Sequence, residues 1–271
     1  MSDQTETSDI DEAEGAASHP QGDGFRRNRG QRYTLFLDEL HQKMVFDWYL
    51  EIGCRAGRTF APVRGNTIAV DPFFKAEGNI ITAKRRLFVF QETSDDFYST
   101  GFLKKNGIEL SFSFLDGMHL FEFLLRDFMN TEANSTADGV IALHDCVPFH
   151  AGMLTRDLDN LPRGPWTGDV WKLIPILQAY RPDLKITVLN CRPTGLVLVS
   201  NLNPKSTKLK QSYDRIVKEW VDVDLVDYGV GRFFDAFESV DATTFAESGY
   251  PVFDKVRRDP EVVATPSRVT K

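Results

Sequence analysis

The segment Tyr49-Leu-Glu-Ile-Gly-Cys-Arg-Ala-Gly57, followed by Thr67-Ile-Ala-Val-Asp71, decides the fold class of this chain. The first stretch predicts a buried strand that passes Glu51 and enters a glycine turn. Glycine tolerates positive φ and lets the backbone approach a ligand without a Cβ. The second strand ends in Asp71, whose carboxylate suits the two vicinal hydroxyls of a ribose. Together they predict a nucleoside-bearing cofactor at the carboxyl ends of a parallel sheet.

The glycine turn supplies the first candidates for contact with this cofactor: Glu51, Gly53, Cys54, Arg55 and Gly57. Its spacing differs from the dinucleotide fingerprint G-x-G-x-x-G, because Arg55 occupies the middle position and no third glycine follows. Binding of NAD or FAD is therefore disfavoured, but an NAD-dependent enzyme stays an alternative. A second alternative is an ordinary tight turn between a strand and a helix.

Charge is distributed unevenly along the 271 residues. Seven of the 39 acidic residues lie in residues 1–24, which contain no Lys or Arg, so the other 32 acids balance 32 bases. A neutral folded part gives no electrostatic case for a nucleic-acid partner. Three scattered cysteines form no disulfide framework or zinc knuckle. Without an apolar run of about 18 residues or a secretory leader, we expect a cytoplasmic protein with no membrane partner.

The chain divides into three parts by composition and periodicity. We expect residues 1–30 to form a disordered acidic tail and a basic linker, because they cannot bury enough apolar surface to offset ordering entropy. Residues 31–240 are predicted to form one domain. Residues 241–271 are predicted to be a partly disordered C-terminal extension. The oligomeric state stays open, with a homo-oligomer among the alternatives.

The apolar pattern of residues 31–240 predicts alternating helices and strands. Seven strands are expected, at 46–52, 67–71, 86–91, 109–115, 138–144, 185–190 and 196–200, and several are continuous apolar runs typical of strands covered on both faces. A short turn joins the last two strands, so the final strand should be antiparallel. The predicted fold is α/β: a Rossmann-like, seven-stranded, mostly parallel sheet with an antiparallel closing hairpin and helices on both faces. Apolar positions at helical spacing predict a helix before the first strand, with Tyr33, Phe36, Leu37, Leu40 and Met44 on one face.

Two strand ends carry the residues best suited to chemistry. The fourth strand ends in Phe114-Leu-Asp-Gly-Met-His119 and the fifth in Ile141-Ala-Leu-His-Asp-Cys146. Because parallel strands place their carboxyl ends on one edge, these segments should converge. Carboxylates and imidazoles suit a divalent cation, which gives Asp116, His144 and Asp145 as candidate metal ligands. His119 is the candidate general base. The alternative is structural: Asp116 would cap the following helix, and His119 would bind backbone.

Two further segments border this edge. Thr93 and Ser94 follow the third strand, where they would contact adenine or ribose, and the alternative is a helix N-cap. The long loop 146–167 contains three prolines and little periodicity, which is typical of a lid or a substrate loop. Its alternative is surface irregularity without function.

The chain resembles the class I S-adenosylmethionine-dependent methyltransferases over residues 33–200. The turn from Glu51 to Gly57 is similar to the family's first motif, and Asp71 matches the acid that binds the ribose hydroxyls. The segments around Asp116 and Asp145 resemble a subgroup of metal-dependent sugar and small-molecule O-methyltransferases. In that subgroup the Asp of an Asp-x-x-His motif binds magnesium and the His is the base, which implies Asp116 and His119.

Three departures from the family pattern accompany this resemblance. Arg55 replaces the usual middle glycine, and His144 replaces a carboxylate in the later acidic pair, which leaves metal dependence open. Only residues 58–65 separate the turn from the second strand, so the usual helix there should be short or absent. The resemblance implies S-adenosylmethionine-dependent methyl transfer to a hydroxyl of a small molecule or sugar, with magnesium as the candidate metal. A non-catalytic binding module of the same fold is a third alternative.

Overall fold

The computed structural model describes residues 24–76 and 78–259. The predicted disorder of residues 1–23 and 260–271 lies outside these described residues. No helix in the described ranges has the length and apolar character needed to span a bilayer.

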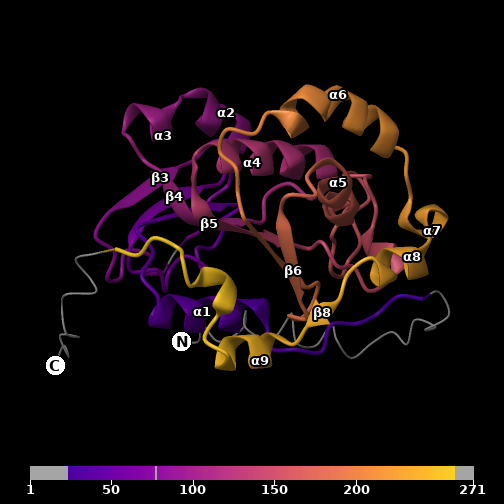
Figure 1. The fold of residues 1–271 in the computed structure, drawn as a ribbon, viewed down its shortest axis with the longest axis horizontal. Coiled ribbons are helices and arrows are strands. Elements are labelled where there is room, and N and C mark those ends of the chain that lie inside the picture. The colour runs from indigo at the N-terminus through magenta and orange to yellow at the C-terminus, as the bar shows by residue number, and fades with distance from the viewer. Residues whose placement is uncertain (1–23, 77, 260–271) are drawn as a thin grey trace, which may run out of the picture.

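One sheet of eight strands organises the fold, in the order β3-β2-β1-β4-β5-β7-β6-β8 (Figure 1). The strands are β1 Trp48–Ile52, β2 Asn66–Val70, β3 Leu87–Phe90, β4 Leu110–Leu115, β5 Ser135–His144, β6 Lys185–Leu189, β7 Leu196–Ser200 and β8 Ser239–Val240. The first five strands pair in parallel, and β7 is antiparallel to both β5 and β6. This topology confirms the predicted α/β class and closing hairpin, and it adds β8, a short strand parallel to β6.

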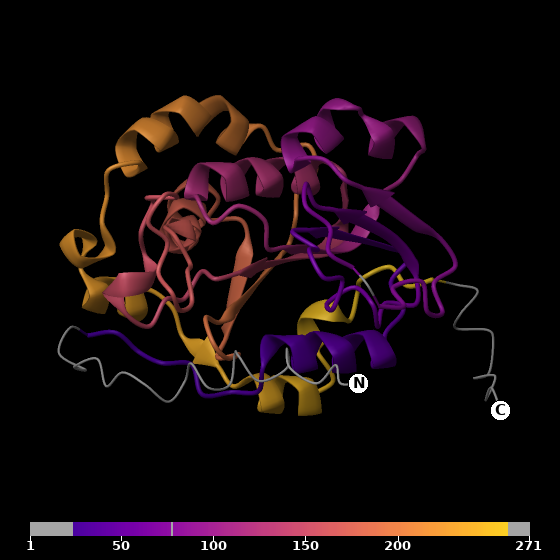
Figure 2. The ribbon, with the colours of Figure 1, turned by 180° about the vertical axis from the view of Figure 1, so that it is seen from behind.

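Helices cover both faces of the sheet. They are α1 Tyr33–Lys43, α2 Ser94–Ser99, α3 Phe102–Lys105, α4 Phe121–Ala133, α5 Leu173–Tyr180, α6 Lys208–Trp220, α7 Leu225–Tyr228, α8 Val230–Asp235 and α9 Ala242–Glu247, with 3₁₀ turns at Ala151–Met153, Val170–Lys172 and Pro251–Phe253. Helices α2, α3, α4 and α6 lie on one side, and α1 and α9 lie on the other (Figures 1 and 2). No regular helix forms between β1 and β2, as the short spacing predicted.

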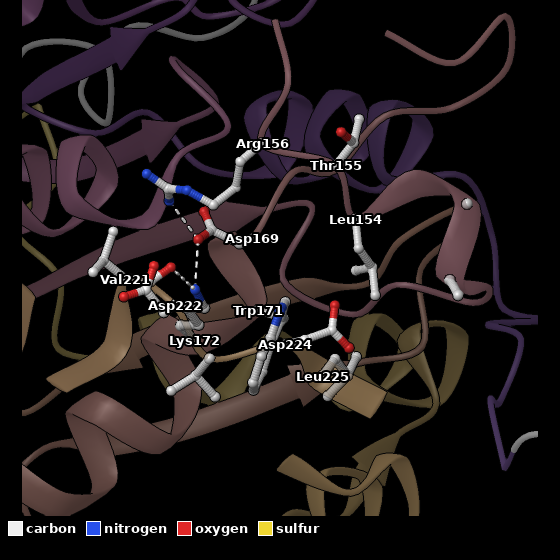
Figure 3. Close-up of a pocket in the computed structure, with 13 residues that line it drawn as sticks. Leu154, Thr155, Arg156, Asp169, Trp171, Lys172, Val221, Asp222, Asp224 and Leu225 are labelled. Carbon is white, nitrogen blue, oxygen red and sulfur yellow. Dashed lines mark hydrogen bonds and ion pairs between the residues drawn. The ribbon is translucent and has the colours of Figure 1, made fainter. Parts of the chain in front are cut away.

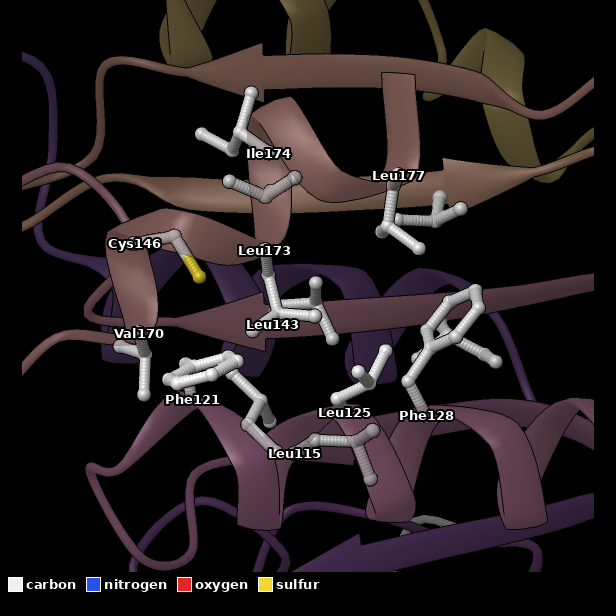
Figure 4. Close-up of a cluster of buried hydrophobic side chains, with 14 of the residues drawn as sticks. Leu115, Phe121, Leu125, Phe128, Leu143, Cys146, Val170, Leu173, Ile174 and Leu177 are labelled. Atoms are coloured by element: carbon white, nitrogen blue, oxygen red, sulfur yellow. The ribbon is translucent and has the colours of Figure 1, made fainter. Parts of the chain in front are cut away.

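The sheet separates two clusters of buried side chains. Successive residues of a strand point to opposite faces, so Ile141 and Leu143 of β5 join the cluster under α4, whereas Val140 and Ala142 join the cluster on α1. Figure 4 shows the first cluster, where Phe121, Leu125 and Phe128 of α4 face β5. Burial on both faces explains why these strands read as continuous apolar runs.

The segment after β8 belongs to the second of these clusters. Phe245 and Tyr250 pack against Phe36 of α1, with ring centroids 6.0 and 5.5 Å away. Phe253 lies 5.1 Å from Phe112 of β4 and is fully buried. Residues 242–256 therefore complete the covering of the sheet on the α1 side.

The parallel register brings four strand ends to one edge. Ile52 of β1 is level with Val70 of β2 and with Leu115 of β4, and Leu115 is level with Leu143 of β5. The residues that follow these positions therefore lie side by side at the carboxyl edge, where open α/β sheets bind ligands.

Candidate active site

The glycine turn that follows β1 contacts the segment that follows β4. Gly53 adopts φ of +88° and Gly57 adopts φ of +76°, in the left-handed region that favours glycine. A Cβ on Gly53 would lie only 1.9 Å from the backbone oxygen of Asp116. Gly53 therefore lets the turn after β1 touch the segment that carries Asp116.

Glu51 holds this turn from within the fold. It is fully buried, and its carboxylate accepts hydrogen bonds from the hydroxyls of Tyr49 at 2.6 Å and of Thr59. Burial raises the pKa of Glu51 to about 8, although both hydroxyls oppose the shift. The structure thus places Glu51 behind the turn, where it fixes Thr59; direct contact with a cofactor stays a prediction.

Asp71 fastens the other side of the turn. Its Oδ2 accepts from the backbone N–H of Arg55 at 2.7 Å, and its Oδ1 accepts from that of Phe73 at 2.6 Å. A carboxylate has about four acceptor sites, so capacity remains for hydroxyl donors. The Cys54 side chain is buried and its Sγ lies 3.2 Å from the Glu51 carbonyl, whereas Arg55 is exposed and has a positive φ of 34°.

The residues after β3 lie at the start of α2, near the edge where the cofactor is expected. Thr93 is the N-cap of α2, because its hydroxyl accepts from the N–H of Asp96 at 3.1 Å. The Ser94 hydroxyl bonds to Asp127 of α4. Thr93 therefore caps the helix, Ser94 contacts a neighbouring helix instead, and contact of either residue with a cofactor stays a prediction. Glu92 has a buried Oε1 with no hydrogen-bond partner in the structure, which sequence reasoning did not single out.

Asp116, His119, His144 and Asp145 converge at the ends of β4 and β5, as the sheet order predicted. The Nε2 of His119 lies 3.2 Å from Asp145 and 3.5 Å from Asp116. The Nδ1 of His144 lies 3.1 Å from Asp116 and 3.4 Å from Asp145. His119 and Asp116 keep 20% and 18% of their side-chain surface exposed, against 6% for His144. A ligand would therefore reach His119 and Asp116 first.

The charges of this cluster compensate one another. Burial lowers the pKa of each imidazole, but the carboxylates, Asp145 foremost, outweigh burial and raise the pKa of His119 to about 9 and that of His144 to about 10. Burial opposes ionisation of Asp145, yet the charges of His144 and His119 hold its pKa well below the usual range. Two carboxylates and two imidazoles can thus be buried together, because each charge has an opposite neighbour.

Side chains from three distant segments support the cluster, and sequence reasoning missed all of them. The hydroxyl of Thr194 donates to Asp145 at 2.5 Å and lies 3.5 Å from Nε2 of His144. The carbonyl of Trp166 lies 2.7 Å from Nδ1 of His119, and the Trp166 ring lies 4.9 Å from the imidazole. The Tyr33 ring lies 3.9 Å from that of His144. No local motif marks these residues.

A pocket of about 460 Å³ is lined by Arg156, Asp169 and Lys172, among other residues (Figure 3). Residues 151, 152 and 154–156 of the long loop form one wall and residues 221–225 form another, and a role of this loop as a lid or substrate loop stays a prediction. Asp169 lines the pocket and also accepts from the N–H of Phe121 at 2.8 Å, while its own N–H donates to the His119 carbonyl at 3.2 Å. The pocket wall therefore holds the His119 loop in place.

Asp169 is itself fixed by two cations that line the same pocket. Lys172 donates to it at 2.7 Å, and Arg156 forms an ion pair with it and with Glu122, as the dashed lines in Figure 3 show for Asp169. These charges are paired, so removing one partner would leave an uncompensated buried charge in the pocket wall. Neither Asp116 nor Asp145 lines the pocket.

Comparisons with known proteins find similarity in structure only. No protein-family model matches the chain, and no curated protein matches it. A similar solved structure is the O-methyltransferase TomG from Streptomyces achromogenes in complex with SAM, at 16% identity over 63% of this chain and 80% of that one, with a TM-score of 0.48. The O-methyltransferase from Bacillus cereus in complex with SAH is 18% identical over 62% and 79%, with a TM-score of 0.42.

A third similar structure is the MycE methyltransferase from the mycinamycin biosynthetic pathway, in complex with Mg, SAH and mycinamycin VI. It is 14% identical over 64% of this chain and 49% of that one, with a TM-score of 0.39. All three are methyltransferases bound to SAM or SAH. Similarity this distant transfers no activity, so the residues of the site carry the case for function.

Proposed function

We propose that this chain transfers a methyl group from S-adenosylmethionine to a hydroxyl of a small molecule or sugar. One observation carries the proposal: the glycine turn with Asp71 and the cluster of Asp116, His119 and Asp145 meet at the same edge. The contact of Gly53 with the Asp116 backbone joins them. A cofactor on the turn would therefore lie beside groups that can handle a proton.

The carboxyl edge fits the nucleoside part of the cofactor. Asp71 keeps acceptor capacity for the ribose diol after its two backbone hydrogen bonds. Glu92, two residues after the end of β3, has a buried carboxylate oxygen without a partner in the structure. A buried acceptor without a donor is costly, and a hydroxyl or amino group of a bound nucleoside would remove that cost.

The donor set of Asp116, His144 and Asp145 fits a divalent cation. Ligand atoms of these three residues lie within 4.8 Å of one another. Carboxylate oxygens suit magnesium and manganese, and the imidazole extends the choice to zinc. When bound, such an ion would supply a Lewis acid that lowers the pKa of the acceptor hydroxyl.

His119 is suited to accept the proton that the reaction releases. The backbone carbonyl of Trp166 can only accept a hydrogen bond, so its contact with Nδ1 of His119 places a proton on Nδ1. The other ring nitrogen, Nε2, then faces the carboxylates. In the step, an oxygen lone pair forms a bond to the methyl carbon, and the carbon–sulfur electrons pass to the sulfonium. The hydroxyl proton would go to Nε2 of His119 in its neutral form, which predominates above its pKa of about 9, and S-adenosylhomocysteine would leave uncharged. Holding oxygen and methyl in line would contribute several kcal/mol.

A methyl-transfer screen tests this proposal. Labelled S-adenosylmethionine is offered with glycans and small alcohols, with and without EDTA, and the label on the acceptor is measured. We expect transfer to at least one acceptor, loss of transfer with EDTA and recovery with magnesium. In His119→Ala the turnover should fall roughly 10²- to 10⁴-fold, while the affinity for S-adenosylhomocysteine is unchanged. Equal loss of turnover and cofactor affinity would argue against His119 as the base.

A further inference from the structure

Residues 24–33, called here the N-terminal strap, lie against the loop 190–195 that joins β6 and β7. Three backbone hydrogen bonds connect the two segments: Gly30 N to Asn190 O at 2.9 Å, Arg192 N to Gln31 O at 3.0 Å, and Tyr33 N to Arg192 O at 3.1 Å. The Nε of Arg192 also donates to the Gly30 carbonyl at 2.9 Å. The strap is thus fixed at its C-terminal end, where Tyr33 begins α1.

The same loop and strap enclose the imidazole of His144 from two sides. Thr194 of the loop lies 3.5 Å from Nε2 of His144 and donates to Asp145. Tyr33 of the strap covers one face of the ring, with centroids 3.9 Å apart and planes tilted by 38°. Phe114 contacts the imidazole at an interplanar angle of 62°, with centroids 6.0 Å apart. The ring is therefore confined to one orientation.

This orientation is the one that metal binding would need. It turns Nδ1 of His144 toward Asp116 at 3.1 Å and toward Asp145 at 3.4 Å. Burial raises the pKa of the Tyr33 phenol far above its ordinary value, and the charges of Asp116 and Asp145 raise it further. The phenol is therefore neutral at any ordinary pH and brings no charge of its own to the cluster.

We propose that Tyr33 is a positioning residue for a divalent-cation site: its ring holds the His144 imidazole with Nδ1 facing Asp116 and Asp145. The proposal rests on the proposed function in that the same three residues are the metal ligands there. It makes Tyr33, the last residue of the N-terminal strap, part of the site. Residues that orient metal ligands change metal affinity by about 10- to 100-fold when replaced.

Calorimetric titration of the full-length protein with Mn²⁺ tests this role. Tyr33→Leu removes the stacked ring, Tyr33→Phe keeps it, and Tyr180→Leu makes the same exchange at the end of α5. We expect Tyr33→Leu to bind Mn²⁺ at least about tenfold more weakly than the wild type. Tyr33→Phe and Tyr180→Leu should stay within about threefold. Wild-type affinity in Tyr33→Leu, or an equal loss in Tyr180→Leu, would overturn the proposal.

Titration of the same variants with S-adenosylhomocysteine distinguishes failure of the Tyr33 proposal from failure of the proposed function. Unchanged affinity in Tyr33→Leu shows that the fold persists, so a weaker Mn²⁺ site is then specific. Parallel loss of both ligands in that variant contradicts the proposal, because general loss of structure would produce it. A wild type that binds Mn²⁺ but not S-adenosylhomocysteine defeats the proposed function and leaves the Tyr33 comparison intact. A wild type that binds only S-adenosylhomocysteine defeats the Tyr33 proposal alone.

Discussion

Asp127 is a carboxyl group buried on α4 beside the loop that carries Asp116. A Cβ on Gly117 of that loop would lie 3.5 Å from its Oδ2. Burial raises the pKa of Asp127 to about 7, against a hydrogen bond from Ser94 that lowers it. The pKa of Asp127 is therefore higher in the folded state than in the unfolded state, where it is near 4. The stabilisation that the protonated group gives the folded state is complete below pH 4 and is lost as the pH rises to 7. Ionised Asp127 therefore destabilises the fold at neutral pH.

Asp127→Asn should remove this pH dependence, because the amide resembles the protonated carboxyl and stays neutral at every pH. We expect the variant to gain stability relative to the wild type as the pH rises, with the difference in unfolding free energy growing by about 2–3 kcal/mol from pH 5 to pH 8. Urea unfolding at both values measures it. A difference that stays constant would show that Asp127 is ionised in the fold at pH 5.

The reactive residues of the candidate site could be predicted because they follow strands. Asp116 and His119 come after β4, and His144 and Asp145 end β5, so the parallel sheet brings them to one edge. Tyr33 and Thr194 could not be found this way. Their place depends on how a strap and a hairpin loop pack across the edge, and no periodicity encodes such packing.

Among the elements of the site, the glycine turn makes a close backbone contact with the segment that follows β4. Gly53→Ala would combine a Cβ 1.9 Å from the Asp116 backbone with φ of +88°, which L side chains rarely adopt. We expect more than about 2 kcal/mol of lost stability and a large loss of affinity for S-adenosylhomocysteine. Gly78→Ala is the control, because its Cβ would meet no atom within 4 Å.

Urea unfolding and calorimetry on both glycine variants measure these effects. Equal stability and affinity in the two variants would show that the turn and the Asp116 segment can separate without loss. The outcome therefore tests whether β1 and β4 form one binding edge.

Burial on both faces leaves continuous apolar runs that made strands predictable, as in residues 140–143 of β5 and 196–199 of β7. Strand β8 has only two residues, Ser239 and Val240, which is too short for any period to show. Its place depends on pairing with β6, a contact between distant parts of the chain.

Across the whole molecule, the hydrophobic core extends beyond the domain boundary predicted at residue 240. That boundary marks only the position where the regular spacing of apolar residues ends. Phe245, Tyr250 and Phe253 are spaced irregularly, yet all three pack against α1 or β4. Truncation after residue 240 should therefore abolish cooperative unfolding. Loss of one buried aromatic side chain typically costs about 3–5 kcal/mol, and a domain has only about 5–15 kcal/mol of stability.

A chain truncated after residue 259 is the matched control, because it keeps every described C-terminal residue. It should unfold cooperatively with the thermal midpoint of the full chain, whereas residues 1–240 should show no transition by circular dichroism. A cooperative transition in the shorter chain would show that residues 241–259 pack without contributing to stability.

Calorimetric titration of the full chain tests most directly whether the carboxyl edge binds an S-adenosyl cofactor. S-adenosylhomocysteine and NAD are titrated separately, each with and without magnesium. We expect saturable one-to-one binding of S-adenosylhomocysteine and no binding of NAD. Binding of NAD alone would favour a dinucleotide-dependent enzyme on the same sheet, and binding of neither would contradict an enzymatic role for this edge.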